Sequence, residues 1–149
     1  MTIGKICNRN VVCATRETTV VEAANLMRRH HIGDLVVVDE SNGRRLPVGI
    51  VTDRDIVVEV VAPGLDAKGI RLGDLLIGRL TSVEEREHSA DVVRLMAAKG
   101  VRRMPVVDSA GILVGIVTID DLLPQLATEL RELSELAPRS RQRELETRK

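Results

Sequence analysis

Residues 48–55 read VGIVTDRD, and residues 114–121 read VGIVTIDD. The two segments lie 66 positions apart and share six of their eight residues. Upstream of them, residues 35–39 (LVVVD) correspond to residues 104–108 (MPVVD), 69 positions apart. The three-residue difference falls in the turn between the segments, where insertions are well tolerated. The chain therefore contains an internal duplication, and its fold is built from two copies of one unit.

Each copy is predicted to form a β-α-β-β-α unit, so the fold class is α/β. Thr19 and Glu22 have the spacing of a capping box, and apolar residues recur after them at helical spacing. In the second copy Ser89 is the expected N-cap, and Gly100 suits the left-handed conformation that ends a helix. Two short β-branched runs follow in each copy, joined by a turn. These strands are almost wholly apolar, so one copy cannot cover both of their faces, and two pseudo-symmetric copies must pack as one module.

Changes in composition divide the chain. Residues 62–66 (APGLD) read as a linker, so residues 1–66 are expected to be the first repeat with an N-terminal lead-in. Residues 67–137 are expected to be the second repeat, which ends in a long helix. Pro138 is expected to stop that helix and to leave residues 138–149 as a charged, flexible tail.

The composition argues against several classes of function. The 22 Lys and Arg residues balance 22 Asp and Glu residues, which disfavours a broad nucleic-acid surface. There is no Phe, Tyr or Trp, so no aromatic ring can stack on an unpaired base. No apolar run approaches the roughly 18 residues of a membrane span. No export signal is visible at the N-terminus, so we expect a cytoplasmic protein with neither membrane nor nucleic-acid partners.

Two Thr-x-x-Asp motifs are the candidate binding residues, Thr52 with Asp55 and Thr118 with Asp121. Each Thr is expected to begin a helix, whose free N–H groups attract phosphate, while the Asp could accept hydrogen bonds from both hydroxyls of a ribose. The same spacing is also that of a capping box, in which these side chains satisfy the helix itself. Spacing alone favours the cap, because capping is the commoner use of this pattern. The two roles are compatible.

Arg102 and Arg103 are the second candidate group. They lie at a corner between a predicted helix and a predicted strand, and the planar guanidinium suits phosphate oxygens. The alternative is a solvated basic pair without a ligand. In the first copy Gly33 and Asp34 occupy the corresponding positions, so the two corners differ in charge.

The sequence indicates neither an enzyme nor a metal site, and we assign no catalytic residue and no metal ligand. It contains no nucleophile elbow, phosphate-binding loop, zinc-protease motif or dinucleotide fingerprint. His30 and His31 are adjacent, so on a helix they point about 100° apart and do not readily share a metal. Cys7 and Cys13 lie six positions apart and do not form a Cys-x-x-Cys pair.

The paired segments resemble the repeat of the CBS (cystathionine-β-synthase-type) domain family. Residues 100–108 (GVRRMPVVD) and 115–122 (GIVTIDDL) carry the resemblance most closely, and it extends over roughly residues 3–126. The first copy departs from the pattern at Val36, where the second has Pro105, and at Gly33 and Asp34. The resemblance implies a Bateman module, in which two repeats bind adenosyl compounds such as AMP, ADP, ATP or S-adenosylmethionine in clefts between them. It also implies that Asp55 and Asp121 contact ribose and that the basic corner lies near the phosphates.

We therefore expect a stand-alone, ligand-sensing regulatory module that needs no cofactor and binds an adenine nucleotide as a regulatory ligand. One cleft should dominate, and we expect it to combine Arg102 and Arg103 with Asp121 rather than Asp55. The alternatives are a structural dimerisation module with empty clefts and an adaptor whose last helix binds an unidentified target protein. A homodimer is expected, because leucines recur at three- to four-residue spacing on the last helix: Leu122, Leu123, Leu126, Leu130, Leu133 and Leu136.

Overall fold

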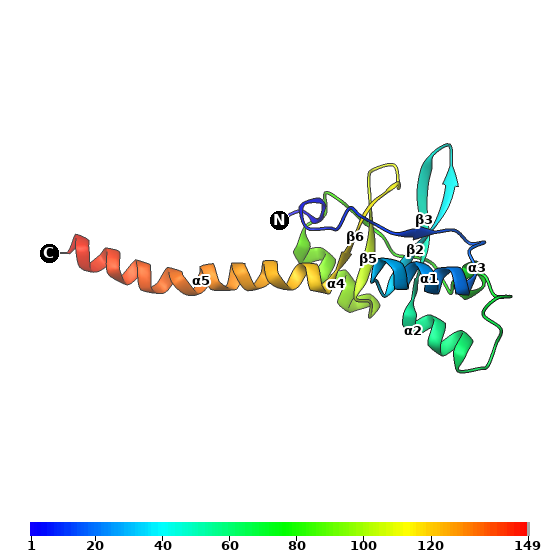
Figure 1. Ribbon diagram of the computed structural model, residues 1–149. Helices are drawn as coiled ribbons and strands as arrows, with labels where there is room; N and C mark the ends of the chain where they lie inside the picture. Colours follow the sequence, from blue (N-terminus) through cyan, green and yellow to red (C-terminus); the bar gives the residue numbers. More distant parts are fainter. Residues whose placement is uncertain (149) are drawn as a thin grey trace.

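The computed structural model describes residues 1–148 and confirms the two β-α-β-β-α units (Figure 1). The first unit contains β1 (Cys13–Ala14), α1 (Val20–His30), β2 (Asp34–Ser41), β3 (Arg44–Thr52), α2 (Asp53–Ile56) and a π-helical turn, η2 (Val57–Val61). The second contains β4 (Val83–Glu84), α4 (Ser89–Lys99), β5 (Arg103–Val107), β6 (Leu113–Thr118) and α5 (Ile119–Thr147). Two short elements precede the units, the 3-10 turn η1 (Ile3–Lys5) and the helix α3 (Leu72–Leu75).

Each unit forms its own three-stranded sheet with the same topology. The first strand pairs in parallel with the second, which pairs antiparallel with the third. The pairing register shifts between Val37 and Val38 in the first sheet and between Val106 and Val107 in the second, at corresponding positions. This shared irregularity supports the duplication independently of sequence identity, because β-bulges are specific features of a fold.

The helix ends agree with the expected caps at α1 and differ at α4. The backbone N–H of Thr19 donates to Glu22 Oε2 at 2.7 Å, and the N–H of Glu22 donates to Thr19 Oγ1 at 3.2 Å, which completes the capping box. The N-cap of α4 is His88, so the expectation for Ser89 was wrong. The reason is tertiary: Ser89 is buried under the N-terminus, and its N–H donates to the Met1 carbonyl at 3.0 Å.

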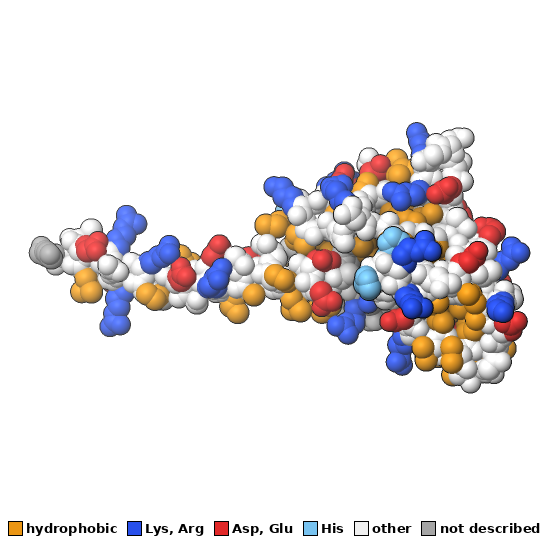
Figure 2. All heavy atoms as spheres, in the orientation of Figure 1, with side chains coloured by type: hydrophobic (Ala, Val, Ile, Leu, Met, Phe, Trp, Pro, Cys, Tyr) orange, Lys and Arg blue, Asp and Glu red, His pale blue; other side chains and the backbone are white. Residues whose placement is uncertain are grey.

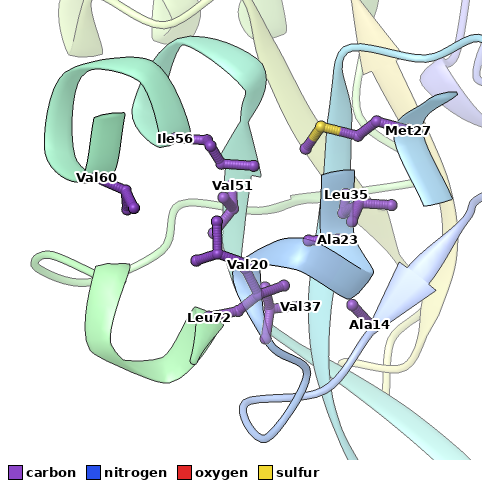
Figure 3. Close-up of a cluster of buried hydrophobic side chains, with 10 residues drawn as sticks. All are labelled: Ala14, Val20, Ala23, Met27, Leu35, Val37, Val51, Ile56, Val60 and Leu72. Atoms are coloured by element: carbon purple, nitrogen blue, oxygen red, sulfur yellow. The ribbon is translucent and has the colours of Figure 1, made fainter. Parts of the chain in front are cut away.

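The hydrophobic core of the first unit lies between its sheet, α1 and the α2–η2 segment (Figure 3). Leu72 belongs to this core although it precedes the second unit in the chain. Reciprocally, Ile3 is fully buried in the core of the second unit with Val83, Val92 and Met104. The two sequence halves thus exchange their leading segments, so neither core is complete without residues from the other half.

A third apolar cluster joins the two sheets. Val36 and Val38 of β2 pack there with Leu113 and Ile116 of β6. Strand faces that would be open in one unit are therefore covered by the other, as expected from their apolar composition.

Helix α5 projects away from the two sheets and does not stop at Pro138 (Figure 1). The expected helix end was therefore wrong, because α5 continues to Thr147. Proline removes one backbone hydrogen bond, but strong helix formers flank it and the Arg139–Glu135 ion pair, at 2.8 Å, spans it. Within residues 1–148 no helix has the length and apolar character needed to cross a membrane.

Candidate functional site

Two clefts lie where the units meet. The larger, which we call the basic cleft, has a volume of about 690 Å³ and is lined by residues 48–50, 52–55, 76–81 and 99–103. The smaller, the acidic cleft, has a volume of about 230 Å³ and is lined by residues 8 and 10–12 with Ile32, Asp34, Ile116, Thr118 and Asp121. The basic cleft combines the end of β3 and α2 from the first unit with the α4–β5 corner of the second.

Thr52 and Asp55 form a capping box on the wall of the basic cleft. The N–H of Thr52 donates to Asp55 Oδ2 at 2.8 Å, and the N–H of Asp55 donates to Thr52 Oγ1 at 3.1 Å. The capping interpretation is therefore confirmed. Among residues 1–148, Asp55 Oδ1 accepts no hydrogen bond, so one oxygen of a half-buried carboxylate stays available to a ligand.

The basic cleft carries an excess of positive charge. Its lining contains two carboxylates, Asp53 and Asp55, and five cationic side chains: Arg54, Arg79, Lys99, Arg102 and Arg103. Guanidinium and ammonium groups form charge-assisted hydrogen bonds with phosphate that are about twice as strong as neutral ones. The cleft is thus suited to an anionic ligand.

The acidic cleft has the opposite charge. Thr118 and Asp121 repeat the capping box there: the Thr118 N–H donates to Asp121 Oδ2 at 2.8 Å, and the Asp121 N–H donates to Thr118 Oγ1 at 3.3 Å. Asp34 lines the same cleft, and the lining contains no Lys or Arg. Two carboxylates in this lining disfavour a phosphate group, and the cation that pairs with Asp34, Arg103, faces the other cleft.

The expected partnership of the arginines with Asp121 was wrong. Arg102 and Arg103 line the cleft of Thr52 and Asp55, while Asp121 lies in the other cleft. The reason is that each cleft takes its Thr-x-x-Asp motif from one unit and its helix–strand corner from the other. The Thr-x-x-Asp motif and the helix–strand corner of the same unit therefore line different clefts.

Sequence reasoning missed the segment of residues 76–81, which forms another wall of the basic cleft. Leu76 packs over Gly49, where an added Cβ would lie 2.3 Å from Leu76 Cδ2. Arg79 brings a fifth cation from this segment. The glycine repeated inside the two VGIVT segments, at positions 49 and 115, could have indicated a close approach of another segment in both units.

Neither cysteine has the surroundings of a reactive thiol. Burial raises the pKa of Cys7 and of Cys13, so both thiols are protonated at neutral pH. No group of three or more His, Cys, Asp and Glu side chains in the described part of the chain is arranged to hold a metal ion.

Comparison with known proteins identifies the family. The model of the CBS domain matches residues 3–62 and 72–128. The chain belongs to the CBS domain family. CBS domain pairs are generally regulatory.

Two curated relatives match most of the chain. An uncharacterized protein of Methanopyrus kandleri is 37% identical over 135 residues, which is 89% of this chain and 67% of that protein. Hypoxic response protein 1 of Mycobacterium tuberculosis is 36% identical over 125 residues, 84% of this chain and 85% of that protein.

A solved structure shows the same arrangement of two CBS domains. The CBS domain pair of protein MJ0100, in complex with 5′-methylthioadenosine and S-adenosyl-L-methionine, superposes with a TM-score of 0.74 at 25% identity. The match covers 87% of this chain and 98% of the other.

Proposed function

We propose that this CBS domain pair senses an adenine nucleotide in the basic cleft. The observation that carries the proposal is the meeting of Thr52 and Asp55 with Arg102 and Arg103 around one cavity of about 690 Å³. Cavities of roughly 300–1,000 Å³ are typical of small-molecule sites. Catalytic machinery is not part of the proposal.

The lining matches the parts of a nucleotide. The available oxygen of Asp55 would accept hydrogen bonds from ribose hydroxyls, and the cationic corner would hold the phosphates. Val48, Ile50 and Leu76 would contact the base, because the chain has no aromatic ring to do so. The adenosyl ligands of the MJ0100 pair support an adenosyl compound here, and the excess of cations favours one that carries phosphate.

A ligand in this cleft would touch both units and the segment between them. Binding would therefore favour the arrangement of the units in which these contacts form, and this population shift would be the signal. The receiver would be either a second copy or a target protein. Exposed apolar side chains on η2 and, separately, on α5 offer surfaces for it (Figure 2): Val57, Val58, Val61, Leu123, Leu126, Leu130, Leu133 and Leu136.

Calorimetry and thermal shift with AMP, ADP, ATP and S-adenosylmethionine test the proposal. We expect Asp55→Asn to weaken nucleotide binding about tenfold or more, because a charged hydrogen-bond acceptor is lost. The asparagine keeps an oxygen that can accept the cap hydrogen bond from Thr52. Asp121→Asn makes the same change in the other capping box and should leave the affinity within about twofold of wild type.

Equal losses in the two variants would contradict the assignment of the basic cleft. If wild-type protein binds none of the four compounds, the alternative function is a structural dimerisation or partner-binding module with empty clefts. The exposed leucines of α5 favour that alternative.

A further inference from the structure

The two clefts are separated by an ion pair between equivalent residues of the two units. Asp34 and Arg103 occupy corresponding positions, 69 apart, at the starts of β2 and β5. The Arg103 guanidinium donates through Nη1 to Asp34 Oδ2. The side chain of Arg103 is 32% exposed and that of Asp34 is 21% exposed, so the pair is largely withdrawn from water.

The partners of this pair face different clefts. Arg103 lines the basic cleft with Thr52 and Asp55, whereas Asp34 lines the acidic cleft with Asp121. The duplicated positions thus carry opposite charges. Because the two side chains are in contact, each charge lies close to both clefts.

We propose that Asp34 is the specificity-determining residue that restricts phosphate binding to the basic cleft and limits its strength there. On one side, the carboxylate adds to the negative charge of Asp121 and excludes phosphate from the acidic cleft. On the other, it occupies part of the Arg103 fork and reduces the positive potential that a phosphate meets. This inference rests on the proposed nucleotide function. Asp34 lines no part of the basic cleft, so it acts through Arg103.

The charge mechanism makes the effect depend on the charge of the ligand. Replacing Asp34 with asparagine removes a negative charge close to the phosphate site and frees Arg103 donors. We expect Asp34→Asn to bind ATP about tenfold more tightly than wild type, with a smaller gain for AMP. Uncharged 5′-methylthioadenosine should bind both proteins equally. Added salt should reduce the gain for ATP, because it screens the interaction.

Calorimetry with these three compounds on the full chain is the experiment, with Asp39→Asn as the control. Asp39 lies on the same strand and also pairs with an arginine, Arg16 at 2.9 Å, but lines neither cleft. It should leave all three affinities unchanged. Wild type should bind one ATP per chain. In an Arg103→Gln background, Asp34→Asn should give a smaller gain for ATP, because part of its effect passes through Arg103.

Several results would overturn the inference. Unchanged or weaker ATP binding by Asp34→Asn would do so, as would an equal change for 5′-methylthioadenosine, which indicates a purely structural role. Two equivalent ATP sites in wild type would contradict the restriction to one cleft. Asp34→Ala, also neutral, replaces Asp34→Asn if that variant melts early. If wild type binds no adenosyl compound, the proposed function fails separately. The inference then stands only if Asp34→Asn binds pyrophosphate more tightly than wild type and Asp39→Asn binds it equally.

Discussion

At the scale of single residues, two glycines allow the exchange of leading segments. Gly49 lies under Leu76, and Gly115 lies under Cys7 and Asn8. A Cβ at position 115 would lie 3.0 Å from the Asn8 carbonyl oxygen, which is held by the Ile116 N–H at 2.9 Å. At position 49 the neighbour is the end of a leucine side chain. The same residue type therefore faces a rigid neighbour in one unit and an adaptable one in the other.

Substitution of the two glycines by alanine should separate stability from binding. We expect Gly115→Ala to lower the free energy of unfolding by about 1–3 kcal/mol, because backbone must shift to admit the methyl group. Gly49→Ala should cost less stability but weaken nucleotide binding, since Leu76 turns and changes the cleft wall. Urea denaturation and calorimetry on both variants measure these effects. A larger stability loss for Gly49→Ala would mean that Leu76 is the more rigid neighbour.

At the scale of elements, α5 is the exception to local rules. It is 29 residues long and contains Pro124 and Pro138. Its first turns bury Leu122 in the second core, whereas Leu130 is 69% exposed. Beyond the sheets the helix is held by its own backbone hydrogen bonds and by ion pairs one turn apart, such as Arg139–Glu135 and Arg148–Glu144. Such pairs contribute only about 0.3–0.5 kcal/mol each.

Removal of residues 139–149 should leave the body of the molecule unchanged. The side chains of residues 139–148 are all exposed, so no core contact is lost. We expect a change in melting temperature of less than about 2 °C and an unchanged nucleotide affinity. Differential scanning calorimetry on the truncated chain measures the first quantity. A fall of several degrees would show that this end of α5 packs against something in solution.

At the scale of the whole molecule, the exposed apolar surface exceeds what isolated side chains explain. Leu126, Leu130 and Leu133 follow one another at helical spacing on α5, and Val57 and Val61 are exposed on η2. A row of exposed apolar side chains along one face of a helix, as on α5, is typical of an interaction site. One of the two proposed receivers of the signal is a second copy of the chain.

Light scattering should therefore give about twice the chain mass of 16.4 kDa at micromolar concentration. The double variant Leu126→Arg, Leu130→Arg should give the monomer mass, because charge on this face prevents its burial. Leu145→Arg is the control: Leu145 is 71% exposed but falls outside the leucine spacing, so the dimer should persist. A wild-type chain that stays monomeric at micromolar concentrations would contradict the proposed dimer.

The sequence by itself determined the duplication, the β-α-β-β-α order and three of the capping boxes. These features are local, because a VGIVT strand and a Thr-x-x-Asp or Thr-x-x-Glu capping box each depend on interactions within a few residues of chain. Residue pattern and propensity therefore suffice to predict them. The six candidate site residues were also visible as residue types. Local rules failed at Pro138, which lies inside α5 although proline costs a helix interior about 3 kcal/mol, and at Ser89, which the N-terminus covers.

Only the tertiary structure decided which residues line the same cleft. Asp55 shares a cleft with Arg102 and Arg103 because the motif of the first unit packs beside the corner of the second. No spacing along the chain indicates this packing. The packing of the two units also brings Asp34 into contact with Arg103, places Ile3 in the second core and Leu72 in the first, and gives the two clefts opposite charge. Two nearly identical sequence motifs thus meet different surroundings, because each cleft takes its helix–strand corner from the copy that does not supply its motif, and the two corners differ in charge.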